Sequence, residues 1–182
     1  MRSDRGDASG SLKPMTERLL VRAPTVDDLL AYEAHFLHPE IVRWLRPPPL
    51  PGFDEPQVVD LLHRDCRHWD NHGFGPWVLE DPRSGEFVGR GGLAWTEVED
   101  VLAVELPWSI EPARHGEGLA TAAAMLAVEQ ADSLGFEAVI ALILPHNVAS
   151  RRVAEKAGMA AEREVEHAGL PHLLYRRSLG LS

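Results

Sequence analysis

The stretch EPARHGEGLAT, residues 111–121, places two glycines immediately before an alanine-rich run that is typical of a helix. Gly116 and Gly118 weaken helical structure, so their position indicates either a turn or a ligand held close to the backbone. The first turn of a helix presents N–H groups without intrahelical partners, at the positive end of the helix dipole. Because glycine lacks a Cβ, an anion can approach these donors, and this arrangement favours a phosphate.

Two better-known phosphate-binding patterns fit this loop less well. A P-loop requires Lys followed by Ser or Thr after its second glycine, and neither follows Gly118. A dinucleotide-binding loop would carry a third glycine where Thr121 stands, and an acidic residue after the next strand, which instead ends in ALILPHN, residues 141–147. A dinucleotide-dependent oxidoreductase is therefore disfavoured, and the two glycines alone are also compatible with a simple turn.

A second group of potential ligands lies in segment 54–73, which has the apolar spacing of a helix. His68 and His72 are four residues apart, a spacing that can bind zinc on one face of a helix. No third ligand stands at a suitable spacing, and a histidine just before Gly73 is also favoured by the negative end of the helix dipole. We therefore predict structural roles for both histidines, no metal site, and a packing role for Cys66.

The composition is that of a globular protein, since 45% of the 182 residues are hydrophobic and 25% are charged. A chain of this length is predicted to form one domain. The formal net charge of −10 argues against nucleic acid or an anionic membrane as the main partner, because both require a basic surface. No apolar run approaches the ~20 residues of a membrane span, and Cys66 is the only cysteine, so we expect a cytoplasmic protein without an internal disulfide.

Hydrophobic periodicity and turn residues predict alternating strands and helices. Residues 1–13 are polar and are predicted to form a flexible tail before a folded domain of residues 14–182. Because a helix connects segments 101–110 and 137–144, these two strands should run parallel within a mixed α/β sheet that has helices on both faces. The predicted strands are 16–23, 76–81, 86–98, 101–110, 137–144, 160–169 and 171–179, and the predicted helices are 24–36, 54–73, 118–134 and 148–158.

Two adjoining stretches resemble consecutive motifs of the GCN5-related N-acetyltransferases (GNAT), within the branch typified by the ribosomal-protein acetylases RimJ and RimL. The first, ELPWSIEPARHGEGLATAAA, contains the family's R/Q-x-x-G-x-G/A loop, which binds the pyrophosphate of coenzyme A and aligns here with residues 115–120. The N-terminal segment 16–45 also resembles that branch, so the resemblance covers nearly the whole chain after residue 13. The second stretch, LPHNVASRRVAEKAGM, matches N-x-x-S-x-x-V-x-x-K-x-G through Asn147, Ser150, Val153, Lys156 and Gly158.

The resemblance implies acetyl-CoA as cofactor and a single domain whose mixed, mostly antiparallel sheet is splayed at its centre. The acyl-carrying arm of coenzyme A would lie in a wedge between segments 101–110 and 137–144. Pro107 fits this expectation, because a proline inside a strand marks a bulge or a break in pairing. The residues implied in coenzyme binding are Trp108, Ser109 and Ile110 through freed N–H groups, together with Arg114, His115, Gly116, Glu117, Gly118, Leu119, Ala120, Thr121, Asn147 and Arg151.

Two catalytic residues are predicted, Glu105 from its place on the strand and Ser150 from the alignment. Glu105 lies on the strand beside the expected acyl group, where burial would raise the pKa of its carboxyl toward that of a base for an ammonium group; the alternative is an ion pair on the other face. Ser150 matches a family position proposed to protonate the departing sulfur. Its alternative role is capping of the helix that follows Asn147, which in turn either contacts coenzyme A or caps that helix.

The sequence also departs from the family pattern. His115 replaces the usual Arg or Gln of the loop, Ala154 stands where many relatives carry a tyrosine acid, and Ala122 replaces a common glutamate. The main hypothesis is an N-acetyltransferase that moves an acetyl group to a primary amine by direct attack. The alternative is a catalytically silent acyl-CoA-binding module that acts as a sensor or interaction partner.

The acceptor stays open in the sequence. Loop 46–53, with its consecutive prolines, and the helices around it are expected to line the acceptor side. A protein N-terminus, an amino sugar, a polyamine and an amino acid all satisfy the requirement for an amine. Relatives often form dimers, so a homodimer is an open alternative to a monomer.

Overall fold

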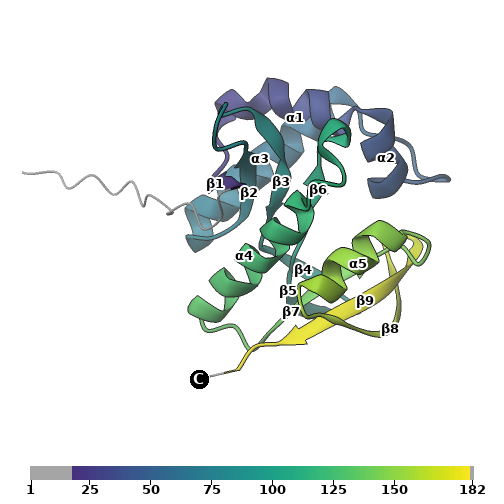
Figure 1. Ribbon diagram of the computed structural model, residues 1–182. Helices are drawn as coiled ribbons and strands as arrows, with labels where there is room; N and C mark the ends of the chain where they lie inside the picture. The colour runs from purple at the N-terminus through teal and green to yellow at the C-terminus, as the bar shows by residue number, and fades with distance from the viewer. Residues whose placement is uncertain (1–17, 181–182) are drawn as a thin grey trace, which may run out of the picture.

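The computed structural model describes residues 18–180 as a mixed α/β domain (Figure 1). The predicted tail, residues 1–13, lies outside the described residues. The helices are α1 (Leu29–Phe36), α2 (Pro39–Leu45), α3 (Glu55–His72), α4 (Leu119–Ser133) and α5 (Val148–Lys156), with short 3-10 turns at Val26–Asp28 and Pro112–Arg114. The strands are β1 (Leu20–Arg22), β2 (Pro76–Glu80), β3 (Phe87–Gly92), β4 (Ala94–Val98), β5 (Val101–Glu105), β6 (Ser109–Ile110), β7 (Ala138–Ile143), β8 (Ala160–His167) and β9 (Leu170–Ser178).

The strands form two sheets that diverge at the centre of the molecule. The first has the order β1-β2-β3-β6 and the second the order β4-β5-β7-β9-β8. Every pairing is antiparallel except that of β5 with β7, which is parallel. The predicted mixed, mostly antiparallel and centrally splayed sheet is therefore confirmed, as is the parallel pair.

The divergence divides two segments that the sequence predicts as single strands. Segment 86–98 breaks at Leu93 into β3 and β4, and segment 101–110 breaks at residues 106–108 into β5 and β6. Pro107 lies in the second break, where its missing N–H and fixed φ stop the ladder. Beyond the break β6 turns to β3, and the approach is so close that a Cβ on Gly89 would overlap the carbonyl oxygen of Ser109.

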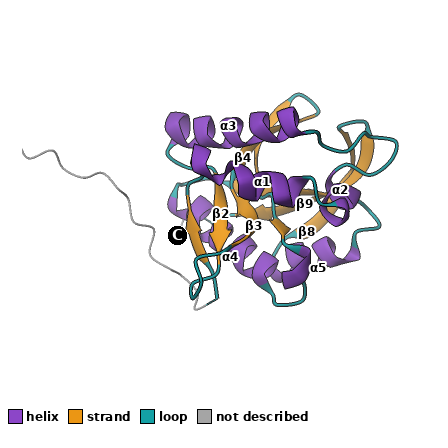
Figure 2. Cartoon of the chain, turned by 90° about the horizontal axis from the view of Figure 1, so that it is seen from above, coloured by secondary structure: helices purple, strands orange, loops and turns teal. Residues whose placement is uncertain are grey.

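Helices cover both faces of the strands, as predicted (Figure 2). On one side α4 packs against β3, β6 and β7 and against α5. On the other, α1, α2 and α3 bury a cluster of their own against β2. Alternation along β2 serves both layers, because Val78 belongs to the cluster with α1 and α3 while Trp77 and Leu79 belong to the core beneath α4.

The ends of α3 follow from the sequence. Asp54 accepts a hydrogen bond from the backbone N–H of Gln57 at 2.9 Å, and the Gln57 side chain accepts one from the Asp54 N–H at 3.2 Å, which is a capping box. Gly73 ends the helix in the left-handed region at φ 70°. The predicted helix 24–36 begins as a 3-10 turn and becomes α-helical only at Leu29.

Helix α2 is absent from the sequence predictions. It begins after His38, whose imidazole accepts a hydrogen bond from the backbone N–H of Glu40 at 3.2 Å, and Pro39 occupies its first turn. Histidine is not among the usual residues that begin helices, so this start carries a weak sequence signal. Among residues 18–180, none of the helices has the length and apolar character needed to cross a membrane.

Candidate active site

The glycine loop between β6 and α4 leaves its backbone open to a ligand. Gly116 has φ 85° and Gly118, the residue before α4, has φ 80°, a region that favours glycine. A Cβ built at Gly116 would meet no atom within 4 Å, and one at Gly118 would approach only the Arg18 guanidinium, at 3.8 Å. The backbone conformation therefore favours glycine at both positions, and no atom lies within 4 Å of a Cβ at Gly116.

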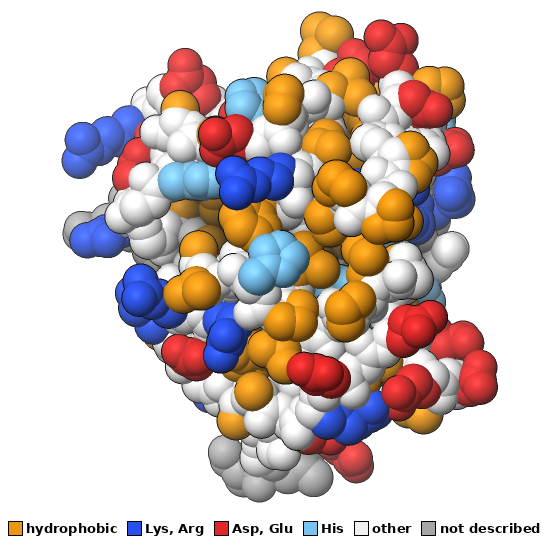
Figure 3. Space-filling view, turned by 90° about the vertical axis from the view of Figure 1, so that its right-hand side faces the viewer, with side chains coloured by type: hydrophobic (Ala, Val, Ile, Leu, Met, Phe, Trp, Pro, Cys, Tyr) orange, Lys and Arg blue, Asp and Glu red, His pale blue; other side chains and the backbone are white. Residues whose placement is uncertain are grey.

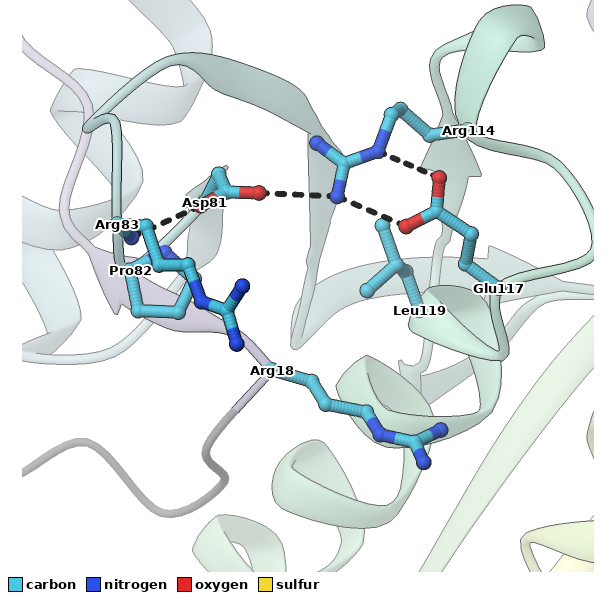
Figure 4. A pocket seen from close by; sticks show the side chains of 7 residues that line it. All are labelled: Arg18, Asp81, Pro82, Arg83, Arg114, Glu117 and Leu119. Atoms are coloured by element: carbon cyan, nitrogen blue, oxygen red, sulfur yellow. Dashed lines mark hydrogen bonds and ion pairs between the residues drawn. The ribbon is translucent and has the colours of Figure 1, made fainter.

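The charged side chains of this loop brace it from one side. The Arg114 guanidinium donates hydrogen bonds to both carboxylate oxygens of Glu117, at 2.6 and 2.8 Å, and to the Asp81 carboxylate at 2.9 Å (Figure 4). The two bonds from Arg114 to Glu117 hold the pKa of the Glu117 carboxyl below its usual range. His115 bonds through Nε2 to the Ile110 carbonyl oxygen at 2.8 Å. Because these side chains are engaged with one another, the donors that the loop offers at the N-terminus of α4 are its backbone N–H groups.

A cavity of about 370 Å³ lies between the Arg114–Glu117 pair and the turn between β2 and β3, and the Arg114–Asp81 bond joins its two sides. Arg114 and Glu117 form one wall, and residues 81–83 form the opposite wall (Figure 4). Leu119, which is buried, and Arg18 complete the lining. The cavity therefore lies against the side-chain surface of the glycine loop.

The gap between β6 and β7 is the second component of the site. The Leu106 N–H donates to the Ile140 carbonyl oxygen at 2.8 Å. Beyond this bond, within residues 18–180, β7 pairs with β9 alone, up to Ile143. The neighbouring chain turns instead to β3, where the Glu111 N–H bonds to the Val88 carbonyl.

The Glu111–Val88 bond fixes the direction of the backbone N–H groups that precede it in the chain. Successive N–H groups of an extended strand point to opposite edges, so the N–H groups of Trp108 and Ile110 face the gap while that of Ser109 faces β3. Of the three donors expected from the sequence, two thus point where a pantetheine arm would lie. The N–H of Ser109 instead faces β3, and its side-chain hydroxyl bonds to His35.

Glu105 ends β5 on the opposite side of the split, facing α3. It pairs with Ile140 and is partly buried, which raises the pKa of its carboxyl, while the positive charge of Arg90 acts in the opposite direction. Arg90 is itself engaged, because its guanidinium donates to the Asp65 carboxylate at 2.6 and 2.7 Å. The Tyr32 hydroxyl donates to the same carboxylate at 3.0 Å. Glu105 is therefore a poorly solvated carboxyl beside Arg90, whose positive charge is balanced by Asp65.

Ser150 and Trp108 meet on the side of the gap that α4 and α5 cover. The Trp108 indole N–H lies 3.4 Å from the Ser150 hydroxyl oxygen and donates to it. The backbone N–H of Ser150 donates to the Asn147 side-chain oxygen at 3.1 Å, so Asn147 caps α5 and the Ser150 hydroxyl does not. The structure thus brings Ser150, the expected acid, into contact with Trp108 beside the gap.

The remaining predicted coenzyme contacts are placed as follows. Arg151 donates to the Tyr175 hydroxyl at 3.1 Å and to the Pro145 carbonyl at 3.3 Å, contacts that fix the loop before α5. In the first turn of α4, Leu119 is buried, so only its backbone can face a ligand, whereas Ala120 and Thr121 are partly exposed.

His68 of α3 contacts the segment after the helix and the break between β3 and β4. Its Nδ1 bonds to the Phe74 carbonyl at 2.8 Å, and its Nε2 accepts the Trp95 N–H at 3.0 Å, which ties the break between β3 and β4 to the end of α3. The His72 ring packs against that of Phe74. Among residues 18–180, no group of three or more potential metal ligands is present.

The expected acceptor side lies where α2 approaches the loop before α5. The rings of Trp44 and His146 are 5.6 Å apart and connect the two halves of the molecule. Figure 3 shows hydrophobic side chains in a band across this face, with histidines among them. Leu45 and Val148 are among the exposed hydrophobic residues, at 41% and 51% exposure. An apolar surface thus borders the gap.

Sequence reasoning missed His35 and Glu111. His35 is fully buried on α1, and its two ring nitrogens bond to Ser109 and Glu111, which lie 74 and 76 residues further along the chain. Only the fold brings these residues together, and a single histidine in a helical segment gives no signal of its own in the sequence.

Comparison with known proteins agrees with this geometry. Residues 18–160 match the family model described as an acetyltransferase (GNAT) domain. The uncharacterized protein YkkB of Bacillus subtilis (strain 168) is 30% identical over 125 residues, which are 68% of this chain and 73% of that protein. A putative GnaT-family acetyltransferase from Bordetella pertussis is 27% identical with a TM-score of 0.74, over 90% of this chain and 98% of that one.

An aminoglycoside acetyltransferase, AAC(6')-Ib, solved in complex with coenzyme A and kanamycin, shares the fold. It is 17% identical with a TM-score of 0.69, over 88% of this chain and 94% of that one. At this identity the likeness concerns the fold alone. From the match over residues 18–160 and from the split sheet beside a glycine loop, we conclude that the chain belongs to the GNAT acetyltransferase family, whose cosubstrate is acetyl-CoA.

Proposed function

We propose that this protein is an acetyl-CoA-dependent N-acetyltransferase that moves an acetyl group to a primary amine by direct attack, without an acyl-enzyme. The observation that carries the proposal is the separation of β6 from β7 after the Leu106–Ile140 hydrogen bond. A thioester arm that enters this gap from the side of α4 and α5 reaches the opposite face, where Glu105 and Arg90 lie.

The residues around the gap fit coenzyme A. The open space outside Gly116 and Gly118 suits a diphosphate at the N-terminus of α4. The gap-facing N–H groups of Trp108 and Ile110 suit the amide oxygens of pantetheine and the thioester oxygen. When bound, acetyl-CoA supplies the activated acyl carbon, and the chain supplies alignment and proton transfer.

We assign the role of general base to Glu105, acting on the incoming ammonium group through a water molecule. A carboxyl whose pKa is raised by burial is a stronger base than an exposed one. We assign the role of general acid to Ser150. Because its oxygen accepts the Trp108 N–H, its own proton is directed away from Trp108 and is available to a departing sulfur.

For the acceptor we favour a small amine or a protein N-terminus that approaches along α2 and loop 46–53. The resemblance to the RimJ and RimL branch supports a protein N-terminus, and the fold shared with an aminoglycoside acetyltransferase supports an amino sugar. The apolar band around Trp44 and His146 suits either acceptor if its cationic amine enters ahead of an apolar body. A cytoplasmic location and a homodimer stay predictions.

One observation favours a second candidate, a silent acyl-CoA-binding module. Ala154, at the position where many relatives carry a tyrosine acid, is fully buried, so α5 presents no proton donor there. In that case the coenzyme would bind without turnover.

The two candidates are separated by thiol release from acetyl-CoA with an alanine-starting peptide, kanamycin, spermidine and free amino acids as acceptors. The enzyme is expected to release thiol with at least one acceptor, and acetyl-CoA, but not NAD, is expected to raise Tm. A raised Tm without thiol release for any acceptor would support the silent module. Equal shifts with NAD and acetyl-CoA would contradict the coenzyme assignment.

Replacing Ser150 by Ala is expected to lower kcat by about 10- to 100-fold, because the departing thiolate loses its proton donor and water replaces it imperfectly. The KM for acetyl-CoA is expected to stay within about twofold, because the backbone N–H that Asn147 caps is retained. The matched control is Ser133→Ala, at the exposed end of α4. A lowered kcat in the control, or an unchanged kcat in Ser150→Ala, would remove the acid role.

A further inference from the structure

We propose that Ser109, His35 and Glu111 form a proton relay for the transfer, in which Ser109 receives the proton that the amine nitrogen loses as the amide bond forms. This inference rests on the proposed acetyltransferase function and adds a second proton acceptor to it. Nothing in the family resemblance assigns roles to the side chains of these three residues.

The relay is a continuous chain of short hydrogen bonds. His35 Nε2 lies 2.7 Å from the Ser109 hydroxyl oxygen, and His35 Nδ1 lies 2.6 Å from a Glu111 carboxylate oxygen. His35 is fully buried, whereas Ser109 is partly exposed and the Glu111 side chain is 27% exposed. A proton can therefore reach the imidazole only through the serine or through the glutamate.

The direction of the relay follows from its chemistry. An ionised carboxylate only accepts hydrogen bonds, so His35 Nδ1 carries a proton and donates a hydrogen bond to Glu111. His35 Nε2 then has a lone pair and accepts the Ser109 hydroxyl proton. This is the arrangement of a base that draws a proton through a serine while a carboxylate holds the imidazole in one tautomer.

The surroundings of His35 keep the imidazole neutral and ready to accept. The rings of Phe36 and Phe87 approach it edge-on, with centroids 4.9 and 5.4 Å away. Burial lowers the pKa of His35, the Glu111 carboxylate opposes this effect, and the positive charge of Arg90 acts in the same direction as burial. An imidazolium formed during turnover would lie directly against the Glu111 carboxylate.

The place of Ser109 in the fold directs its hydroxyl to the acceptor face. It is the first residue of β6, immediately after the break at Pro107, and it pairs with Arg90 of β3. Paired residues share a face of the sheet, so Ser109 lies on the side of α1 and α3, as does Arg90. The amine that attacks an acyl group in the gap would approach from this side.

Proton counting shows why two acceptors are useful. An alkylammonium ion loses one proton to become a nucleophile and a second as the N–C bond forms and the C–S bond breaks. We assign the first proton to Glu105, from which it passes to water, and the second to Ser109, whose own proton moves to His35. One proton must join the sulfur, and Ser150 supplies it and is reprotonated from water, while the loaded relay releases its proton to water through Ser109 or the partly exposed Glu111.

The test compares Ser109→Ala and Glu111→Gln with the wild type and with Ser133→Ala, using thiol release over a range of pH. Ser109→Ala keeps the backbone, so the KM for acetyl-CoA is expected to stay within about twofold while kcat falls about 10- to 100-fold. Because a protonated His35 cannot accept the Ser109 proton, the wild-type rate is expected to fall at low pH. Ser109→Ala is expected to abolish this part of the fall, the acid limb of the pH profile that His35 causes. Glu111→Gln removes the charge that raises the His35 pKa, so that limb is expected to move to lower pH.

Each outcome is decisive. An unchanged kcat in Ser109→Ala overturns the relay, as does a fall in Tm without a change in the pH profile, which would indicate a purely structural bond. A wild-type mass gain of one acetyl group on Ser109 in acetyl-CoA alone would mean a covalent serine and would also overturn it. A wild type that releases thiol with no acceptor fails at the proposed function itself, before any variant is compared.

Discussion

Replacing Glu105 by Gln is expected to lower kcat by about 1000-fold while leaving the Kd of acetyl-CoA within about twofold. The amide keeps the shape of the carboxyl but cannot take a proton from the ammonium group of the acceptor. The coenzyme donors that we infer, the glycine loop and the N–H groups of Trp108 and Ile110, are unaffected by the change. Thiol release and calorimetric titration of acetyl-CoA measure the two quantities.

The pH profile separates a base from a residue that merely packs. Burial raises the pKa of Glu105, so the wild-type rate is expected to fall with decreasing pH at a higher pH than for an ordinary glutamate. The part of this fall that Glu105 causes is expected to disappear in Glu105→Gln, and the part that His35 causes is expected to remain. Glu97→Gln, at an exposed position of β4, is the matched control and should retain both rate and limb. An unchanged rate in Glu105→Gln would exclude Glu105 from the mechanism.

Loss of activity in Glu105→Gln should not be accompanied by loss of stability. A carboxyl whose pKa is higher in the folded than in the unfolded state binds its proton more tightly when folded, so its ionised form destabilises the fold above the unfolded pKa. This cost decreases as the pH falls through the folded pKa. Glutamine has no charge, so the Tm of the variant at neutral pH is expected to equal or exceed that of the wild type.

The parts of the site that depend on local backbone chemistry could be predicted from the sequence. Gly116 and Gly118 adopt positive φ, which glycine tolerates because it has no Cβ. Pro107 marks the break that opens the gap, because it lacks an N–H for the strand ladder. The extent of that break could not be predicted, because whether β6 continues with β7 or turns to β3 depends on the close approach that Gly89 permits.

Contacts between distant segments account for what the sequence did not predict. His35 gains its partners only when α1 packs over β6, and residue spacing cannot show a contact across 74 residues. Asn147 and Arg151 were expected to contact coenzyme A, but their side chains also have local partners that fix the start of α5. Helix α2 was missed because His38 is an unusual cap.

The face that holds Glu105 is organised by a buried ion pair between Asp65 and Arg90. The Asp65 side chain is 2% exposed and the Arg90 side chain 12% exposed, and their two hydrogen bonds join α3 to β3. Arg90 also acts on Glu105, whose pKa it lowers against the effect of burial. Asp65 therefore has two effects, since it balances a buried cation and limits the influence of that cation on the proposed base.

Replacing Asp65 by Ala is expected to destabilise the fold by about 3–5 kcal/mol, because Arg90 stays buried without a partner and the Tyr32 hydroxyl loses its acceptor. For a domain of this size each kcal/mol corresponds to about 2–4 °C in Tm, so a fall of about 6–20 °C is expected in a thermal melt. Glu162→Ala, which breaks the exposed pair with Arg176, is the comparison variant and should change Tm little.

A double variant, Asp65→Leu with Arg90→Met, distinguishes an unbalanced charge from lost packing. If the cost of Asp65→Ala comes from the uncompensated guanidinium, removing both charges should recover most of the lost Tm, because apolar residues of similar volume can replace a buried ion pair at little cost. A double variant no more stable than Asp65→Ala would contradict this explanation. In the recovered fold Glu105 would lose the cation beside it, so its pKa is expected to rise further and the acid limb of the rate to move to higher pH.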